Sequence, residues 1–391
     1  MISVQQALQL IEQQTQKTSN TVTISVSEAL GYVLAKDVFS PIDMPPFRQS
    51  AMDGYALGSV QETTYTLVNE VKAGDTEDPE IKEGQAIRIF TGAPVPSAAK
   101  TVVIQEKVEV SNHQITLQES TVPMANIREV GEQIKKGDTA LSKDTKITPA
   151  GIGYLATLGV TEIEVYKKPT IAIITTGNEL VAPGQPLSYG QIYESNSLML
   201  VSALQKSGFS AVSTYKVSDN YEDTQALLEK TIADHDVILI SGGISVGDYD
   251  FVGKALRNIG VEEVFYKVKQ KPGKPLFYGK HKNKTIFALP GNPASSLSCF
   301  YIYVLPAILK LSGYSNYHLE RGKGVANSNF TKKGERAAFL KAHNDHGQIT
   351  ILDAQASSML RSFALANTLV YLPEDTTEVT IGDTIEIINL P

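Results

Sequence analysis

The chain has 391 residues, of which 42% are hydrophobic and 20% are charged, and both values are ordinary for globular proteins. Acidic residues outnumber basic ones by 42 to 35, so the net charge of −7 argues against a large nucleic-acid interface, which needs a basic face. The single cysteine, Cys299, excludes an internal disulfide framework and a multi-cysteine metal site. We expect no apolar run of the ~18 residues that a membrane span needs. We also expect no targeting segment. The default expectation is a cytoplasmic protein of two to four domains, at roughly 100–200 residues per domain.

Three helical patterns frame the amino-terminal part of the chain. Apolar residues recur at helical spacing over residues 4–11, where Ser3 and Gln6 can form a capping box. A second helical pattern lies around residues 26–34. The third covers residues 147–158, begins through a proline and ends at a glycine.

Two stretches are typical of β-rich modules, because short β-branched and aromatic runs alternate with Gly, Pro and Asp turns. The first begins at residue 55 and covers the residues to about 110, and its predicted strands are 65–68, 86–90, 101–104 and 114–117. The second follows residue 317, and its predicted strands are 338–341, 348–352, 368–371 and 384–388. The first stretch predicts a small barrel or sandwich, and the second predicts a smaller β module.

Between these modules, strands and helices alternate. Apolar strands are predicted over 170–175, 236–240 and 285–289, and helices over 195–206 and 294–305. This alternation favours a parallel, doubly wound sheet. The sequence therefore predicts a multidomain α/β protein, with one α/β core, two β-rich appendages and a helical amino-terminal piece.

Three polar, glycine-bearing loops follow the strands of the predicted sheet. They cover residues 175–179, 241–250 and 290–296. In open parallel sheets the ligand lies beyond the carboxyl ends of the strands, so we expect these loops to surround one site. In the first loop, Gly177 precedes Glu179, which is either a ligand of a bound cation or a carboxylate that favours a helix dipole.

The second loop carries the most chemistry. Its glycines let backbone amides approach an anion closely, and its serines add hydroxyl donors. These residues are Ser241, Gly242, Gly243, Ser245 and Gly247. Asp248 and Asp250 supply hard oxygen ligands of the kind that Mg²⁺ prefers. The alternative interpretation is a glycine turn with solvated aspartates.

A lysine-rich segment, residues 267–274, precedes the last predicted strand of the sheet. Alternation places Lys267, Lys269 and Lys271 on one face of a strand, and a Pro-Gly turn presents Lys274. Lysine ammonium groups act as point charges for phosphates, so the segment is interpreted as a polyanion site. A solvated strand edge is the alternative.

The third loop precedes a helix, and a helix amino end is an anion site in its own right. The loop consists of Pro290, Gly291, Asn292 and Pro293. Ser295 and Ser296 lie in the first turn of the predicted helix, whereas Cys299 is expected in the core. A rigid turn with an N-cap explains the same residues.

Two stiff, proline-bearing loops of the first β module hold two further polar residues of interest. Asp53 precedes a glycine in one of them, and Thr91 lies in the other. Each residue either contacts a ligand or stabilises an ordinary turn.

Six motifs occur together in this sequence, and through them it resembles the MoeA family of molybdopterin molybdenumtransferases, which includes the E domain of gephyrin. The motifs are PPFRQSAMDGYA (45–56), FTGAPVP (90–96), TGNEL (176–180), SGGISVGDYD (241–250), KPGKP (271–275) and LPGNP (289–293). The resemblance spans nearly the whole chain. Several molybdopterin-binding and related domains share the glycine-loop and PGNP pair, whereas the MDGYA loop and the C-terminal β module are more specific.

The resemblance implies an elongated homodimer of four-domain subunits. It implies a helical linker and dimerisation domain (1–40 with 138–168), an inserted β-rich domain (41–137), a molybdopterin-binding α/β domain (169–316) and a C-terminal β-barrel-like domain (317–391). It implies that adenylylated molybdopterin and molybdate react with Mg²⁺ to form molybdenum cofactor and AMP. A molybdopterin adenylyltransferase is the implied upstream partner, and neither nucleic acid nor a membrane is expected.

The resemblance also assigns roles to residues of this sequence. The implied catalytic residues are Asp53, Glu179, Asp248, Asp250, Lys271 and Lys274, of which Glu179, Asp248 and Asp250 are the metal ligands. The implied cofactor-binding residues are Thr91, Gly177, Asp219, Ser241, Gly242, Gly243, Ser245, Gly247, Lys267, Pro290, Gly291, Asn292 and Pro293. Molybdate is assigned to Lys274, Pro275, Ser295, Arg336 and Ser358. Asp53 and Thr91 match a cleft wall that the partner subunit supplies.

The sequence departs from the family pattern at its amino-terminal side. Gln133 and Lys100 replace acidic residues, and Arg48 and Gln49 replace the usual Asp or Asn and Asn. A cation bound near them would bind less well. Two hypotheses rival the molybdenum insertase. One is a molybdopterin-binding scaffold homologue with weak or no turnover, which would not need the retained residues Glu179, Asp248, Asp250, Lys271 and Lys274. The other is a generic nucleotide hydrolase, which leaves the two β modules unexplained.

Overall fold

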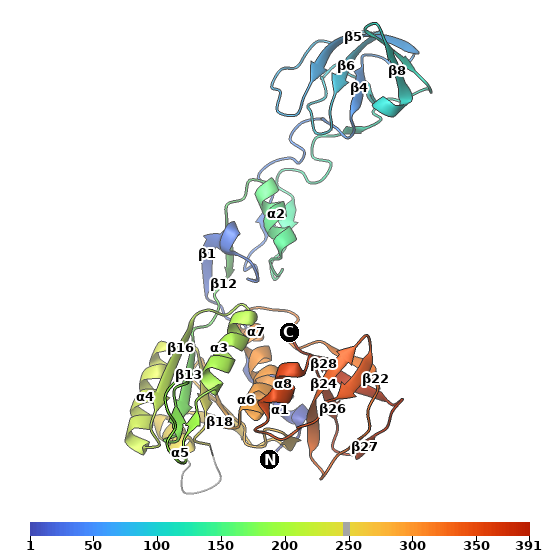
Figure 1. The fold of residues 1–391 in the computed structure, drawn as a ribbon. Coiled ribbons are helices and arrows are strands. Elements are labelled where there is room, and N and C mark those ends of the chain that lie inside the picture. Colours follow the sequence, from blue (N-terminus) through green and yellow to red (C-terminus); the bar gives the residue numbers. More distant parts are fainter. Residues whose placement is uncertain (245–250) are drawn as a thin grey trace. The chain divides into compact units, whose positions relative to one another are not determined.

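In a computed structural model, which describes residues 1–244 and 251–391, the chain forms two compact units (Figure 1). The first unit comprises Met1–Val22, Gly31–Val33 and Tyr166–Pro391. The second comprises Thr23–Leu30 and Leu34–Val165. The predicted division into four domains stays a prediction.

The first unit is built on a six-stranded sheet with the order β16-β13-β17-β21-β20-β18. Its parallel strands are β13 (Ile171–Thr176), β16 (Val212–Val217), β17 (Val237–Ser241) and β21 (Lys284–Leu289). The antiparallel strands β20 (Phe277–His281) and β18 (Glu262–Tyr266) complete one edge. The predicted strands are therefore confirmed to within one residue at each end.

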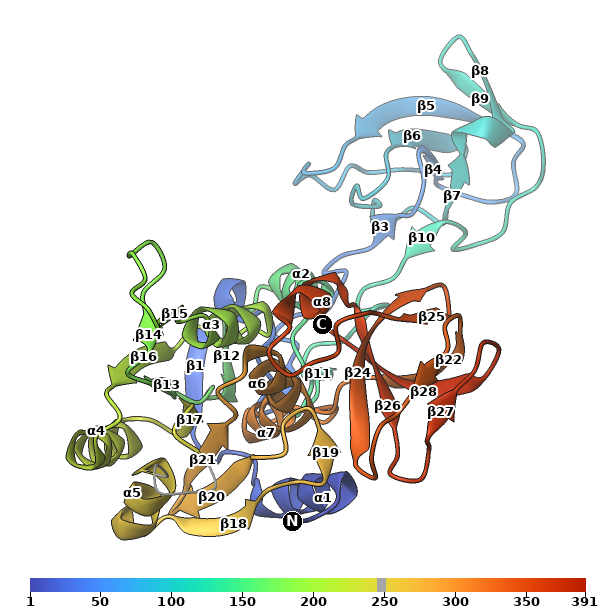
Figure 2. The ribbon, with the colours of Figure 1, turned by 60° about the horizontal axis from the view of Figure 1, so that its bottom comes forward.

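Helices cover both faces of this sheet (Figure 2). One face carries α1 (Val4–Gln14), α3 (Asn196–Lys206), α6 (Pro293–Cys299) and α7 (Leu305–Leu311), and the other carries α4 (Tyr221–Asp234) and α5 (Phe251–Ile259). Successive strand residues point to opposite faces, so Ile171 and Ile173 belong to the first core and Ala172 and Ile174 to the second. The doubly wound architecture is confirmed.

One helical stretch differs from the sequence expectation. Helix α6 continues through a π-helical turn, Phe300–Val304, into α7, so Pro293–Leu311 forms 19 residues that are apolar and long enough to cross a membrane. The expectation of no such run is wrong by length and composition. However, 72% of the apolar window is buried inside the protein, and Cys299, Phe300 and Tyr303 lie fully buried in the first core. The stretch is therefore a core helix of the α/β unit.

The amino-terminal helix α1 packs into the same core. Its predicted capping box is confirmed, because the Ser3 hydroxyl accepts from the Gln6 amide and the Gln6 side chain accepts from the Ser3 amide. Val4, Ala7 and Ile11 are buried with the sheet residues, so this helix belongs to the α/β unit.

The second predicted helix, around residues 26–34, is wrong. Only a single 3₁₀ turn forms there, η1 (Val26–Glu28). Gly31 adopts a left-handed φ of 73°, and Leu34 bridges to Val165 in extended backbone. Both features end a helix, although the apolar spacing alone is helical.

The carboxyl-terminal residues form a closed barrel in the first unit. Strands β22 (Arg321–Ala326), β24 (Ala337–Asp345), β25 (Gln348–Ile351), β26 (Thr368–Leu372) and β28 (Thr384–Asn389) close because β24 pairs with both β25 and β26. Leu340, Ile349 and Val370 lie in its core. Short elements complete it: β23 (Phe330–Thr331), β27 (Glu378–Val379) and α8 (Leu360–Leu365). The predicted second β module is confirmed.

The second unit contains a six-stranded sheet with the order β7-β4-β6-β5-β9-β8. Its strands are β4 (Gly54–Leu57), β5 (Thr64–Val71), β6 (Gln85–Ile89), β7 (Thr101–Ile104), β8 (Val108–Ser111) and β9 (Gln114–Leu117). The rest of the unit contains α2 (Pro149–Thr157), η2 (Gln105–Lys107) and the pairs β1 (Thr21–Ser25) with β12 (Glu162–Tyr166), β2 (Val38–Phe39) with β11 (Thr139–Leu141), and β3 (Gln49–Ser50) with β10 (Ile127–Arg128). The first predicted β module and the helix at Pro149 are confirmed.

Candidate active site

A cavity of about 730 Å³ opens at the carboxyl ends of β13, β17 and β21. This volume suits a small-molecule ligand, for which pockets of roughly 300–1,000 Å³ are usual. The predicted site residues that line it are Gly177, Glu179, Asp219, Ser241, Gly242, Gly243, Pro275, Pro290, Gly291, Asn292, Pro293 and Ser358. A small parallel pair, β14 (Leu180–Val181) with β15 (Ile192–Tyr193), contributes to the wall. The structure thus brings the three loops of the sheet together in one cavity.

Glycines let these loops approach one another closely. Gly242 and Gly243 adopt left-handed φ angles of 94° and 66°. A Cβ atom on Gly242 would lie 2.5 Å from the Thr176 carbonyl oxygen, and one on Gly243 would lie 2.7 Å from the Thr176 Cγ2. Only glycine fits both the backbone angle and the space, so backbone rather than side chains forms this wall.

Asn196, the first residue of α3, ties the second loop to the third. Its Nδ2 donates to the Ser241 Oγ at 2.8 Å and to the Gly291 carbonyl at 2.7 Å. The side chain lines the cavity and is only 8% exposed, and its Oδ1 has no hydrogen-bond partner within the part of the chain that the structure describes. The sequence reasoning missed this residue, because an Asn at a helix start also has an ordinary capping role.

The three acidic residues that line this cavity, Glu179, Glu194 and Asp219, differ in their surroundings. The Glu194 carboxylate accepts from the Ser197 amide at 2.9 Å and from the Ser197 hydroxyl, so it is engaged at the start of α3. The Asp219 carboxylate accepts from the Thr176 hydroxyl at 2.5 Å and from the Asn178 amide at 3.3 Å, so it holds the first loop against the end of β16. The Glu179 carboxylate is exposed and has no hydrogen-bond partner among the described residues. Glu179 is therefore the carboxylate that is available to a ligand or a cation.

Two of the three predicted metal ligands belong to the second loop beyond Ile244. Asp248 and Asp250, like Ser245 and Gly247, lie outside the described residues. Within residues 1–244 and 251–391, no group of three or more His, Cys, Asp or Glu side chains is gathered around a common point. Glu179 is the single predicted ligand that the described residues contribute, and its hard oxygen atoms match the preference of Mg²⁺.

The lysine segment does not form the predicted regular strand. Lys267 has a left-handed φ of 71°, and only Gln270–Lys271 (β19) is extended, so the prediction that Lys267, Lys269 and Lys271 share one strand face is wrong. Lys267 lies over the Tyr266 ring, 4.8 Å from its centroid. Lys269 pairs with Glu374 at 2.6 Å, and this hydrogen bond raises the Lys269 pKa. Lys269 is therefore engaged within the protein.

Two other lysines of the segment are exposed. Neither Lys271 nor Lys274 lines the cavity, although the next residue, Pro275, does. Their ammonium groups have no partner in the described part of the chain, so they are free to meet an anion. Gly273 between them has a φ of 84°, and a Cβ there would lie 2.5 Å from the Cys299 sulfur. Burial raises the pKa of Cys299 to about 12, as expected for a core thiol.

Backbone pairing holds the lysine segment on both sides. Ile2 bridges to Val268 in parallel register, and the Ile2 carbonyl accepts from the Lys269 amide at 2.8 Å. On the other side, β19 pairs in parallel with β24 of the barrel. Arg336 donates to the Gln270 carbonyl at 3.1 Å and does not line the cavity. Arg336 therefore holds the segment that carries the lysines.

The barrel also contributes a loop to the cavity, between β25 and α8. The Asn292 side chain donates to the Ser357 hydroxyl at 3.0 Å, and the Ser295 amide donates to the Ser357 carbonyl at 3.2 Å. Ser358 lines the cavity, whereas Ser295 is buried beneath the contact and does not. Ser357 was missed by the sequence reasoning, which chose its neighbour.

A buried lysine fixes this loop. The Lys341 ammonium donates to the carbonyls of Ala354, Ala356 and Met359 at 3.0, 3.3 and 3.1 Å. Burial lowers the pKa of Lys341 to about 8. No pattern in the sequence marks Lys341, because a single lysine in a strand is usually solvated.

Asp53 and Thr91 lie in the second unit and contact each other. One Asp53 oxygen accepts from the Thr91 amide at 2.7 Å and from its hydroxyl at 2.8 Å, and these bonds lower the Asp53 pKa. The MDGYA and FTGAP motifs thus form one local structure. Arg48, a departure from the family pattern, donates to the carbonyls of Ser97 and Ala99, so it has a structural role.

Models of known protein families match three ranges of this chain. A probable molybdopterin-binding domain matches residues 172–310, which contain the sheet and its three loops. The MoeA N-terminal region (domain I and II) matches residues 2–159, and the MoeA C-terminal region (domain IV) matches residues 323–390. Together the matches cover most of the chain. The chain belongs to the MoeA family.

Individual relatives are similar to this chain over all or nearly all of their lengths. A molybdopterin molybdenumtransferase of Haemophilus influenzae is 33% identical over 99% of this chain and 98% of its own length. Molybdopterin molybdenumtransferase 2 of Mycobacterium tuberculosis is 33% identical, with 100% of both chains covered. The crystal structure of the molybdopterin biosynthesis moeA protein from Pyrococcus horikoshii is similar with a TM-score of 0.85 and 28% identity, over 100% of each chain.

Proposed function

We propose that this chain inserts molybdenum into molybdopterin in the biosynthesis of the molybdenum cofactor. The observation that carries the proposal is the cavity at the carboxyl ends of β13, β17 and β21, which three glycine-bearing loops line in a member of the MoeA family. Relatives that match almost the whole chain are named molybdopterin molybdenumtransferases. The substrates we propose are adenylylated molybdopterin and molybdate, and the products are molybdenum cofactor and AMP.

The lining of the cavity suits this chemistry. Backbone amides of Gly242 and Gly243 and the Ser241 hydroxyl approach an anionic substrate without intervening side chains. The buried Asn196 Oδ1 has no donor among residues 1–244 and 251–391, and a pterin carries N–H groups that would satisfy it. We assign molybdate to Lys274, Pro275, Ser295, Arg336 and Ser358, of which Pro275 and Ser358 line the cavity. Donors and cations that converge on developing charge supply most of the stabilisation in reactions of this kind.

Glu179, together with Asp248 and Asp250, would hold a Mg²⁺ ion. The exposed Glu179 carboxylate is a suitable ligand, because the described residues offer it no other partner. Bound Mg²⁺ would neutralise charge on the phosphates of the substrate. The protein needs no cysteine ligand, since the dithiolene of molybdopterin holds the molybdenum, and the single thiol, Cys299, is buried.

Further features of the proposal rest on the family. We propose a cytoplasmic homodimer whose partner subunit supplies Asp53 and Thr91 to the cleft, and a molybdopterin adenylyltransferase that delivers the substrate. The hydrogen bonds between Thr91 and Asp53 support a shared role for these two residues, because they keep the carboxylate ionised at its lowered pKa.

The test is AMP release from adenylylated molybdopterin by the purified chain with Mg²⁺, in the presence and absence of molybdate. Molybdate-dependent release supports the insertase. Tight molybdopterin binding without release supports the scaffold homologue instead, and directs attention to Gln133 and Lys100. Lys274→Ala is expected to weaken molybdate use, whereas the matched variant Lys323→Ala, an exposed lysine of β22, is expected to behave as wild type.

A further inference from the structure

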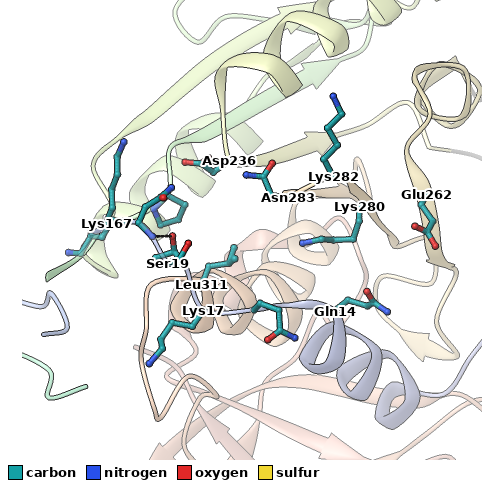
Figure 3. A pocket seen from close by; sticks show the side chains of 15 residues that line it. Gln14, Lys17, Ser19, Lys167, Asp236, Glu262, Lys280, Lys282, Asn283 and Leu311 are labelled. Carbon is teal, nitrogen blue, oxygen red and sulfur yellow. Dashed lines mark hydrogen bonds between the residues drawn. The ribbon is translucent and has the colours of Figure 1, made fainter. Parts of the chain in front are cut away.

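A second cavity, of about 540 Å³, lies at the other end of the same sheet (Figure 3). It is bounded by the residues that precede β13 and β17, by the turn between β20 and β21, and by the segment that follows α1. Strand β13 spans six residues, so at about 3.3 Å per residue the two cavities lie about 20 Å apart. The second cavity is therefore not part of the candidate active site.

Positive charge gathers around this cavity. Five lysines line it, but only two acidic residues, Asp236 and Glu262, do so, although the whole chain carries a net charge of −7. The Asp236 carboxylate is already engaged, because it accepts from the Thr170 amide and hydroxyl at 3.0 Å and pairs with Lys284 at 3.3 Å. Asp236 is therefore not available to balance the lysines of the cavity.

Lys280 is the inner lysine of the cavity. Figure 3 shows its side chain reaching from β20 into the cavity, whereas Lys282 extends away from it. The Lys280 ammonium is partly buried and donates to the Thr285 hydroxyl at 3.0 Å, and it has no ion-pair partner among residues 1–244 and 251–391. Desolvation lowers its pKa. A partly buried cation with a neutral partner is costly, and an anion in the cavity would remove that cost.

The remaining lining indicates what kind of molecule fits. Lys17 and Lys167 are exposed at the rim, where they can meet a second negative group. Ser19 and Asn283 supply polar groups to the wall, whereas no aromatic side chain lines the cavity within the described residues. A planar base would find no stacking partner there. The occupant is therefore polar, compact and multiply charged.

We propose that this cavity binds a small molecule with at least two anionic oxygen groups, a phosphate ester or a polycarboxylate, one group of which pairs with Lys280. The site is separate from the proposed insertase chemistry and does not depend on it. Lys280 provides the inner cation, and the rim lysines attract and hold the outer group.

Titration calorimetry of the full chain with pyrophosphate and with citrate tests the proposal, and the two probes distinguish a phosphate from a carboxylate ligand. We expect one of them to bind, Lys280→Met to weaken it at least tenfold and Lys280→Arg to retain it. Lys274→Ala controls for binding at the candidate active site. Lys254→Met controls for overall charge, because Lys254 lies on α5, away from the cavity, over the ring of Tyr221. Both controls should bind as wild type does at the second cavity.

Thermal unfolding gives a second readout that does not depend on calorimetric heats. Without a probe, Lys280→Met should unfold at or above the wild-type temperature, because it removes a desolvated charge. The probe should then raise the unfolding temperature of the wild type but not that of Lys280→Met. Absence of binding by both probes to the wild type overturns the proposal. Equal binding by the wild type and Lys280→Met also overturns it, since the probe would then bind without pairing with Lys280.

Discussion

Asn196 offers the most direct test of how the cavity is assembled. Asn196→Ala removes two hydrogen bonds, to the Ser241 hydroxyl and the Gly291 carbonyl, and leaves that carbonyl without its donor. Each bond is worth roughly 0.5–1.5 kcal/mol net, so the loss is about 1–3 kcal/mol. Alanine regains about 0.6 kcal/mol of helix propensity at the start of α3. The Gly291 carbonyl, left without its donor, adds to the loss. The local cost is therefore about 2 kcal/mol.

Because the chain has two compact units, a single global unfolding curve would not isolate this cost. Amide hydrogen exchange of peptides that cover α3 and the second loop does, and about 2 kcal/mol corresponds to about 30-fold faster exchange. Ser202→Ala, on the exposed side of the same helix, should change the rate by less than about threefold. Molybdopterin affinity should also fall in Asn196→Ala. Exchange and affinity that both match the Ser202→Ala control would refute the role of Asn196 as the tie between the loops.

Three further predictions concern the rest of the site. Glu179→Gln should lower the Mg²⁺-dependent rate of AMP release while the unfolding free energy changes by less than about 0.5 kcal/mol, because the carboxylate is exposed; an unchanged rate removes Glu179 from the mechanism. Gly273→Ala should destabilise its unit by about 2–4 kcal/mol through its left-handed backbone and the 2.5 Å approach to the Cys299 sulfur. Cys299→Ala in the same chain should recover part of that loss, and amide hydrogen exchange of peptides that cover the lysine segment measures both. Burial in the folded state lowers the Lys341 pKa to about 8, so the unfolded chain binds more protons than the folded chain above that pH. The unfolding free energy of the wild type relative to that of Lys341→Met should therefore rise between pH 8 and 10. A difference in unfolding free energy that does not change with pH contradicts the burial argument.

The sequence predicts the scaffold of the site well, because that scaffold depends on local pattern. Apolar strands such as β13 and β17, followed by glycine loops, define both the sheet and the edge at which ligands bind. The prediction failed where conformation depends on distant contacts. Lys267 leaves the extended region because its segment is paired with Ile2 on one side and with β24 of the barrel on the other, and no alternation of side chains reveals that.

The same limit applies to individual site residues. Asn196 and Lys341 act through carbonyls that lie 95 and up to 18 positions away, so their residue types alone carry no signal. Arg336 and Ser295 were assigned to molybdate from the family pattern, and the structure gives them contacts with backbone behind the cavity. These assignments stay predictions until the variants are measured.

The pairing of the lysine segment has a practical consequence for anyone who handles this protein. Ile2 is a β-bridge partner of Val268, two residues from the strand that joins the barrel. A fusion tag, an uncleaved extension or a truncation at the amino terminus therefore acts on the backbone pairing of the segment that carries Lys271 and Lys274. Kinetic comparisons between preparations are meaningful only when their first residues are identical, and a tag belongs after Pro391, which is exposed.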